Sequence, residues 1–153
     1  MFLKTDKIKK EWIDYNGHMN VAYYVYIFDK ASDVILSTFK MAGDSAKNNN
    51  KSTFVVEMHT NYIQEVQSGD EVETHLTYID HDKKRINYKL SMFHKEKKYL
   101  SATIEVLSLY VDLSQRKVVE FDSDRIKLMD DFIKKNSAKF SNENLVFSKK
   151  LKK

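Results

Sequence analysis

The sequence of 153 residues contains no cysteine, only three glycines and only three arginines. Without cysteine there is no disulfide, no thiolate nucleophile and no thiolate metal site, which agrees with a reducing compartment. Three glycines leave little room for a phosphate-binding loop, and neither glycine-rich nucleotide motif is present. The net charge of +4 comes mainly from lysine, and the densest basic run is confined to residues 149–153. We therefore expect no nucleic-acid partner.

The sequence also lacks a long apolar run. No segment approaches 18 uninterrupted apolar residues, and residues 1–6 lack the apolar core of a signal peptide, so we expect a cytoplasmic protein without a membrane partner. The length, with 42% hydrophobic and 31% charged residues, fits one folded domain. We assign residues 1–135 to this domain and residues 136–153 to a polar, lysine-rich C-terminal tail, which we expect to be poorly ordered.

The most apolar helix that the sequence can form follows Asn20. Apolar residues recur there every three or four positions, at Val21, Tyr24, Val25, Phe28, Ala31, Ile35, Phe39 and Ala42. Asn20 suits the N-cap, and Gly43 suits the position just after a helix. The pattern predicts a helix of about 22 residues with one buried face.

Sheet patterns dominate the rest of the chain. Period-two alternation, the pattern of strands with one face buried, covers residues 53–62, 72–78, 86–92 and 100–111. We predict a first strand within residues 2–10, a polar loop at residues 44–52 and a short closing helix at residues 124–135. A change of parity between Val106 and Leu107 suggests a β-bulge. This order of elements predicts an α+β fold, with helices segregated on one face of an antiparallel sheet.

Asp14 lies in a polar turn directly before the predicted helix. A helix start carries free N–H groups and a partial positive charge. A carboxylate beside it can act as a base or nucleophile while an N–H group stabilises an oxyanion. The alternative is a turn-forming aspartate next to Asn16 and Gly17, which is common in loops.

The chain resembles the 4-hydroxybenzoyl-CoA thioesterase-like family in the spacing of Asp14 and Gly17. They stand three residues apart at the entry to a long helix that precedes an antiparallel sheet. That resemblance implies the hot-dog fold, in which a sheet wraps a long central helix. Residues 12–20, residues 56–59 (Val-Glu-Met-His) and Gly69-Asp70 further resemble the branch associated with carnitine dehydrogenase. The implied enzyme is a hydrolase, an acyl-CoA thioesterase that releases coenzyme A and a small acid, with betainyl-CoA as one candidate substrate.

The resemblance also implies roles for five residues. Asp14 would be the nucleophile or general base, and the backbone N–H of Val21 would polarise the thioester carbonyl. His59 is the third catalytic candidate, while His18 and Glu57 are candidates for substrate binding. Glu57 and His59 share one strand face because side chains two apart point the same way. The alternative is that this is the solvent face of an amphipathic strand.

Lys83, Lys84 and Arg85 lie between two predicted strands, where relatives hold the nucleotide end of coenzyme A with basic residues. The alternative is a solvated turn. The five histidines form no H-E-x-x-H motif, so we predict no metal. We expect no cofactor apart from the coenzyme A of the substrate.

Two other functions stay open at this stage. A hot-dog hydratase pairs an aspartate with a nearby histidine, which Asn16 and His18 loosely echo, although Gly17 stands where that motif has proline. A non-catalytic module of the same fold would bind acyl-CoA without hydrolysing it. Because a wrapped sheet has exposed strand edges, we expect a homodimer or homotetramer with the site between subunits.

Overall fold

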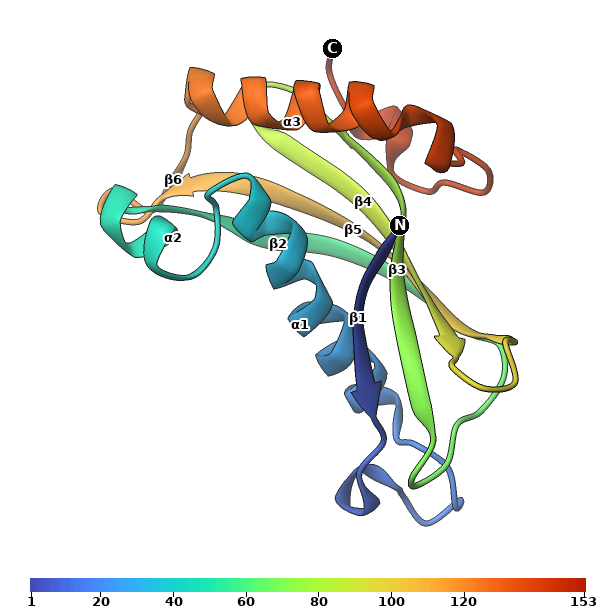
Figure 1. The fold of residues 1–153 in the computed structure, drawn as a ribbon. Helices are drawn as coiled ribbons and strands as arrows, with labels where there is room; N and C mark the ends of the chain where they lie inside the picture. Colours follow the sequence, from blue (N-terminus) through green and yellow to red (C-terminus); the bar gives the residue numbers. More distant parts are fainter.

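The computed structural model describes residues 1–153. In chain order its elements are β1 (Phe2–Lys7), η1 (Lys10–Trp12), α1 (Val21–Thr38), α2 (Gly43–Asn49), β2 (Lys51–Tyr62), β3 (Glu71–His81), β4 (Arg85–His94), β5 (Leu100–Asp112), β6 (Lys117–Val118), α3 (Ser123–Asn136), η2 (Ser137–Lys139) and η3 (Ser148–Lys150). The strands form one antiparallel sheet in the order β1-β3-β4-β5-β2, and β6 pairs with the end of β5. The sheet curves around α1 (Figure 1). The predicted α+β fold, with a long helix wrapped by an antiparallel sheet, is confirmed.

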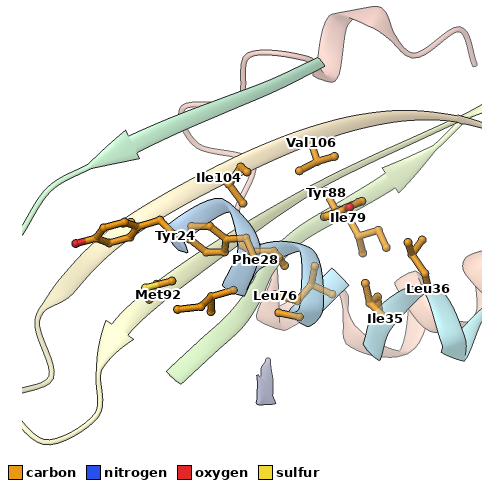
Figure 2. Close-up of a cluster of buried hydrophobic side chains, with 14 of the residues drawn as sticks. Tyr24, Phe28, Ile35, Leu36, Leu76, Ile79, Tyr88, Met92, Ile104 and Val106 are labelled. Atoms are coloured by element: carbon orange, nitrogen blue, oxygen red, sulfur yellow. The ribbon is translucent and has the colours of Figure 1, made fainter. Parts of the chain in front are cut away.

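The contact between α1 and the concave side of the sheet forms the core. The helix buries one face, made by Tyr24, Ile27, Phe28, Ala31, Ser32, Ile35 and Leu36. Side chains of the sheet meet this face, among them Leu76, Ile79, Tyr88, Met92, Ile104 and Val106 (Figure 2). Burying one large apolar side chain contributes about 1.5–3 kcal/mol, so this contact fixes where the helix lies. None of the helices is both long enough and apolar enough to cross a bilayer.

The central helix is shorter than predicted, with 18 residues instead of about 22. It ends because Lys40, at φ 57°, takes the left-handed conformation that closes many helices. The N–H of Met41 then donates to the carbonyl of Leu36 at 2.9 Å. Gly43, which we expected just after this helix, instead begins α2. The structure therefore separates one predicted helix into a helix and a short connection.

The prediction of a polar loop at residues 44–52 is wrong. Its first part forms α2, whose Ala46 is buried, and its last part already belongs to β2. Asn50, in the left-handed conformation, ends α2 and turns the chain into the strand. A helix of seven residues has little stability of its own, so this helix depends on tertiary packing that the local sequence does not reveal.

Strand β2 differs from the pattern predicted for it, because neither of its faces is buried in the single chain. It is an edge strand, and its large apolar side chains are 41–49% exposed: Phe54, Val55, Val56, Met58 and Tyr62. The predicted bulge is displaced as well. Pairing of β4 with β5 is regular through Val106 and Leu107, whereas the pairing of β2 with β5 slips at Val56. The change of parity in β5 arises because that strand is buried on both faces.

The C-terminal tail packs against the convex side of the sheet, which contradicts the expected poor order. Phe147 is buried at 5% exposure, the N–H of Ser141 donates to Thr77 at 2.9 Å, and Lys150 forms an ion pair with Glu57. Side chains facing the tail alternate with core side chains along β4 and β5. The domain boundary at residue 135 stays a prediction.

Glu105 is the main anchor of this tail. Its side chain is 1% exposed and accepts hydrogen bonds from the backbone N–H groups of Val146 (2.6 Å) and Phe147 (2.9 Å). The side-chain amide of Asn87 donates to the same carboxylate at 3.0 Å. Three donors thus satisfy a buried carboxylate that has no cationic partner, and they join the tail to the middle of the sheet.

We predict that Glu105→Gln lowers the free energy of unfolding by about 2 kcal/mol, because the new amide N–H₂ group would oppose one of these donors. The tail should also become accessible to trypsin at its lysines. Urea denaturation and limited proteolysis measure the two effects. Glu143→Gln, on the exposed part of the same tail, is the matched control. Equal stability of both variants would contradict the anchoring role of Glu105.

Candidate active site

Asp14 lies in a tight turn held by its own backbone. Ile13 and Met19 form an isolated antiparallel bridge, the N–H of Asp14 donates to His18 O at 3.1 Å, and the N–H of Gly17 donates to Asp14 O at 3.0 Å. Gly17 has φ 82°, a conformation that a side chain would strain. The turn therefore presents the Asp14 side chain in one defined position.

The Asp14 carboxylate is joined to the start of α1 through Asn20. The side-chain amide of Asn20 donates to Asp14 Oδ2 at 3.4 Å, while its oxygen accepts the N–H of Ala22 at 3.0 Å and caps the helix. The other oxygen, Asp14 Oδ1, accepts the N–H of Asn16 at 2.8 Å. The carboxylate forms no ion pair, so it keeps lone pairs for further partners. Asp14 thus forms the turn and also lies beside the helix start.

The backbone N–H of Val21 is a free donor at this helix start. The N–H of Ala22 is used by the Asn20 side chain and that of Tyr23 by the Asn20 carbonyl, but the N–H of Val21 makes no hydrogen bond. The positive end of the α1 dipole adds to its attraction for a developing negative charge. A carbonyl oxygen is the kind of acceptor that this position suits.

A small pocket of about 130 Å³ opens at the same helix start. The residues that line it are His18, Met19, Val21, Tyr24, Tyr62, Ile63, Gln64 and Glu65. Tyr24 and Tyr62 meet edge to face with their ring centroids 5.2 Å apart, and Tyr62 Oη donates to Val21 O at 3.4 Å. Val21 therefore contributes both to the pocket wall and, through its N–H, to the candidate oxyanion site.

Both tyrosines of the pocket are neutral phenols at pH 7. Burial, with a smaller contribution from the negative charge of Glu65, raises the pKa of Tyr24, and burial raises the pKa of Tyr62. His18 also lines the pocket, with Nδ1 3.2 Å from Met19 O. Because a carbonyl oxygen only accepts, Nδ1 is the donor, and Nε2 of the neutral ring is left as an acceptor.

His59 and Glu57 lie on the other side of the sheet from this pocket. In the pairing of β2 with β5, His59 lies opposite Glu105, the residue that holds the tail on the convex side. Glu57 is paired with Lys150 of the tail. Within one chain the structure therefore does not bring either residue to Asp14, and their catalytic and binding roles stay predictions.

The basic turn formed by Lys83, Lys84 and Arg85 is also remote from Asp14. The Asp14 turn lies near the start of β3, because the N–H of Met19 donates to Val66 O in the segment that leads into this strand, whereas the basic turn follows the other end of the strand. Eleven residues of strand separate the two by roughly 35 Å. Lys83 and Lys84 are exposed, but the Arg85 guanidinium is paired with Asp82 at 2.8 Å. Binding of coenzyme A phosphates by this turn stays a prediction.

Tyr62 and Glu65 also line the pocket, although no local sequence pattern marks them as site residues. They reach the helix start because the N–H of Met19 donates to Val66 O at 3.0 Å and ties the segment after β2 to the Asp14 turn. Apolar and polar residues alternate along the strand up to Tyr62, and nothing in this local pattern indicates the contact with Met19. No three histidine, aspartate or glutamate side chains converge as metal ligands would, and the metal-free site stays an expectation.

The fold and the site together define a class of protein. A curled antiparallel sheet around one long helix is the hot-dog arrangement, and a carboxylate beside a free N–H at the helix start has the groups that hydrolysis of an ester or thioester requires. The family model of the Thioesterase-like superfamily matches residues 8–135. The chain belongs to this superfamily, an acyl-CoA thioesterase family of the hot-dog fold, and is a thioester hydrolase.

Individual relatives agree with this assignment. A betainyl-CoA thioesterase of Pseudomonas aeruginosa is 28% identical over 114 residues, which cover 74% of this chain and 72% of that protein. An L-carnitine dehydrogenase/betainyl-CoA thioesterase of Rhizobium meliloti is 29% identical over 117 residues, or 76% of this chain. The match spans only 23% of that longer relative.

Solved structures show the same fold. A hypothetical protein of Staphylococcus aureus in complex with CoA has a TM-score of 0.83 at 23% identity, covering 95% of this chain and 90% of that chain. A 1,4-dihydroxy-2-naphthoyl-CoA thioesterase of Synechocystis has a TM-score of 0.74 at 15% identity, covering 85% of this chain and 96% of that chain.

We predict that Asp82, beside the basic turn, makes part of the stability depend on acid pH. Burial raises the pKa of this carboxyl, but hydrogen bonds from the N–H of Lys152 and from Lys84 and Arg85 outweigh burial and hold the pKa below its usual value. The stabilisation is then complete above the unfolded pKa of about 3.9 and is lost as the pH falls through the folded pKa.

Asp82→Asn should therefore be less stable at neutral pH and should lose less stability than wild type below about pH 4. Urea denaturation across this pH range is the measurement. Asp131→Asn, which removes an exposed carboxylate without any partner, should keep the wild-type acid slope. Parallel acid slopes for wild type and Asp82→Asn would show that Asp82 does not carry the effect.

Proposed function

We propose that this protein hydrolyses a small acyl-CoA, with betainyl-CoA as the first candidate, to the free acid and coenzyme A. One observation carries the proposal: Asn20 holds the Asp14 carboxylate at the start of α1, where the N–H of Val21 is a free donor. Betainyl-CoA is the first candidate because a relative is named a betainyl-CoA thioesterase. The Staphylococcus aureus neighbour in complex with CoA supports the proposal that the substrate is an ester of coenzyme A.

In the proposed reaction, the thioester carbonyl oxygen accepts the Val21 N–H and the carbonyl carbon faces the Asp14 carboxylate. Asp14 then either attacks this carbon or removes a proton from a water molecule that attacks it. The carbon–sulfur bond breaks, and the coenzyme A thiolate leaves and takes up a proton. When Asp14 attacks, the acyl group is left as an anhydride on its carboxylate, and a water molecule then hydrolyses this anhydride to the acid and free Asp14. When Asp14 acts as a base, water supplies the second oxygen of the acid directly, and neither route requires a cofactor.

We also propose that two copies of the chain associate through β2. This edge strand has 12 residues, unpaired backbone groups and an exposed apolar surface. The opposite edge, β1, is only six residues long and carries Lys4, Asp6 and Lys7, which discourage pairing. Long apolar edges are normally covered, and a second copy of β2 is the cover that matches in length and character. A dimer would also place a second chain near the start of α1, where His18 is half-buried and Tyr62 is exposed.

The pocket limits the size of the acyl group. Its volume of about 130 Å³ is well below the 300 Å³ or more of sites for drug-sized ligands. A hydratase of the same fold would instead need a histidine near the aspartate, and the Nε2 acceptor of His18 is the feature that favours it. A screen of acyl-CoA esters, scored for free thiol and for hydration of enoyl-CoA, separates these activities from binding alone.

We predict that Asp14→Asn lowers kcat for the best acyl-CoA substrate by about 10² or more, because it removes the charge and basicity of the reacting group. An asparagine keeps the oxygen that accepts the Asn16 N–H and loses only the long 3.4 Å hydrogen bond from Asn20 at a half-buried position, so the melting temperature should change little. The measurement is release of free thiol by the purified variant. Asp131→Asn serves as the control for charge. If Asp14→Asn released thiol at the wild-type rate, Asp14 would have only a structural role in the turn.

We predict that wild type sediments as a dimer or larger assembly at micromolar concentration and that Val56→Lys shifts it toward the 18.1 kDa monomer. A lysine on the apolar edge would introduce like charges at the contact between copies. Phe2→Lys, an equally exposed apolar residue on the opposite edge strand β1, should keep the wild-type assembly. Analytical ultracentrifugation of the three proteins decides, and a monomeric wild type would reject the proposal.

A further inference from the structure

The pocket at the start of α1 has two aromatic rings and one carboxylate. Tyr24 lies one helical turn after Val21, and Tyr62 ends β2 opposite it, so their rings form adjoining walls. Figure 2 shows Tyr24 at the end of the buried cluster, with its hydroxyl pointing away from the other labelled side chains. Electron-rich faces of neutral tyrosine rings attract cations, and quaternary ammonium groups most typically.

The only carboxylate of this pocket is not used by any cation of the protein. Glu65 is exposed and forms no ion pair, and the only hydrogen bond of its side chain comes from the neutral amide of Gln67 at 3.3 Å. No lysine or arginine lines the pocket, although the chain has 26 of them and a net charge of +4. A negative pocket in a positive protein is therefore a local feature and not a result of overall composition.

We propose that Tyr24, Tyr62 and Glu65 select an acyl group that carries a small permanent positive charge, such as a trimethylammonium group. This inference rests on the proposed thioesterase function and identifies what determines its specificity. The carbonyl of the substrate lies at the Val21 N–H, and the cationic end of the acyl group lies in the pocket against the wall that the two touching rings form. Glu65, at the open side of the pocket, supplies the countercharge.

The decisive pair of substrates is betainyl-CoA and tert-butylacetyl-CoA, which have the same shape and differ by one positive charge. Wild type should prefer betainyl-CoA in kcat/KM by about tenfold or more. Glu65→Gln should lower kcat/KM for betainyl-CoA by about fivefold and leave the neutral ester unchanged. Tyr62→Leu should lose part of the same preference, and Tyr62→Phe, which keeps the ring, should retain it.

Glu96→Gln, an exposed carboxylate on the turn between β4 and β5, is the control for net charge and should behave as wild type. Equal kcat/KM of wild type for the two esters, or an equal loss on both esters in Glu65→Gln, would overturn the selection of a cation while leaving the thioesterase function intact. If neither ester is hydrolysed, titration of wild type and Glu65→Gln with glycine betaine and with tert-butylacetate, followed by NMR, still tests the pocket. Tighter binding of glycine betaine that Glu65→Gln abolishes supports the inference, and equal binding of both acids contradicts it.

Discussion

The packing of α1 against the concave side of the sheet is the contact on which the rest of the structure depends. Side chains such as Ile27, Phe28 and Ile35 are almost fully buried there, and the sheet can curve as it does because the helix fills its concave side. With about 1.5–3 kcal/mol for each large side chain, this contact rivals the net stability of a domain of this size. A helix held so firmly along its length also has a fixed N-terminus, which is where Asn20 and Val21 lie.

Asn20 connects this fixed end of the helix to the Asp14 carboxylate. One side chain both caps the helix and donates to Asp14, so the carboxylate and the free N–H of Val21 are placed relative to each other by a single residue. The segment after β2 is tied to the same point through Met19 and Val66. Two parts of the sequence that are distant from each other, the Asp14 turn with the helix start and the segment after β2, thus meet at one helix end, and the pocket is the space that they leave. Catalytic groups built on a capped, packed helix are held more precisely than groups on a free loop.

The sequence was informative where local patterns and tertiary packing agree. The periodicity of α1 and the alternation in β3 and β4 predicted the fold, and the Asp14 turn was found because its residues stand together in the chain. It failed where burial comes from a distant segment. The helix α2 and the double burial of β5 depend on contacts that no local period records. Glu65 was missed for the same reason, because only the hydrogen bond between Met19 and Val66 brings its segment to the helix start.

The two edges and two faces of the sheet show how unevenly its surface is used. The convex face is covered by the tail, which Glu105 anchors, and the concave face by α1. The edge at β1 is short and charged, so only the edge at β2 combines length, apolar side chains and free backbone groups. This edge ends at Tyr62, which donates to the carbonyl of Val21. A chain that pairs with β2 therefore also approaches the start of α1. Because Tyr62 of the same strand lines the pocket, such pairing would act on the shape of the pocket as well.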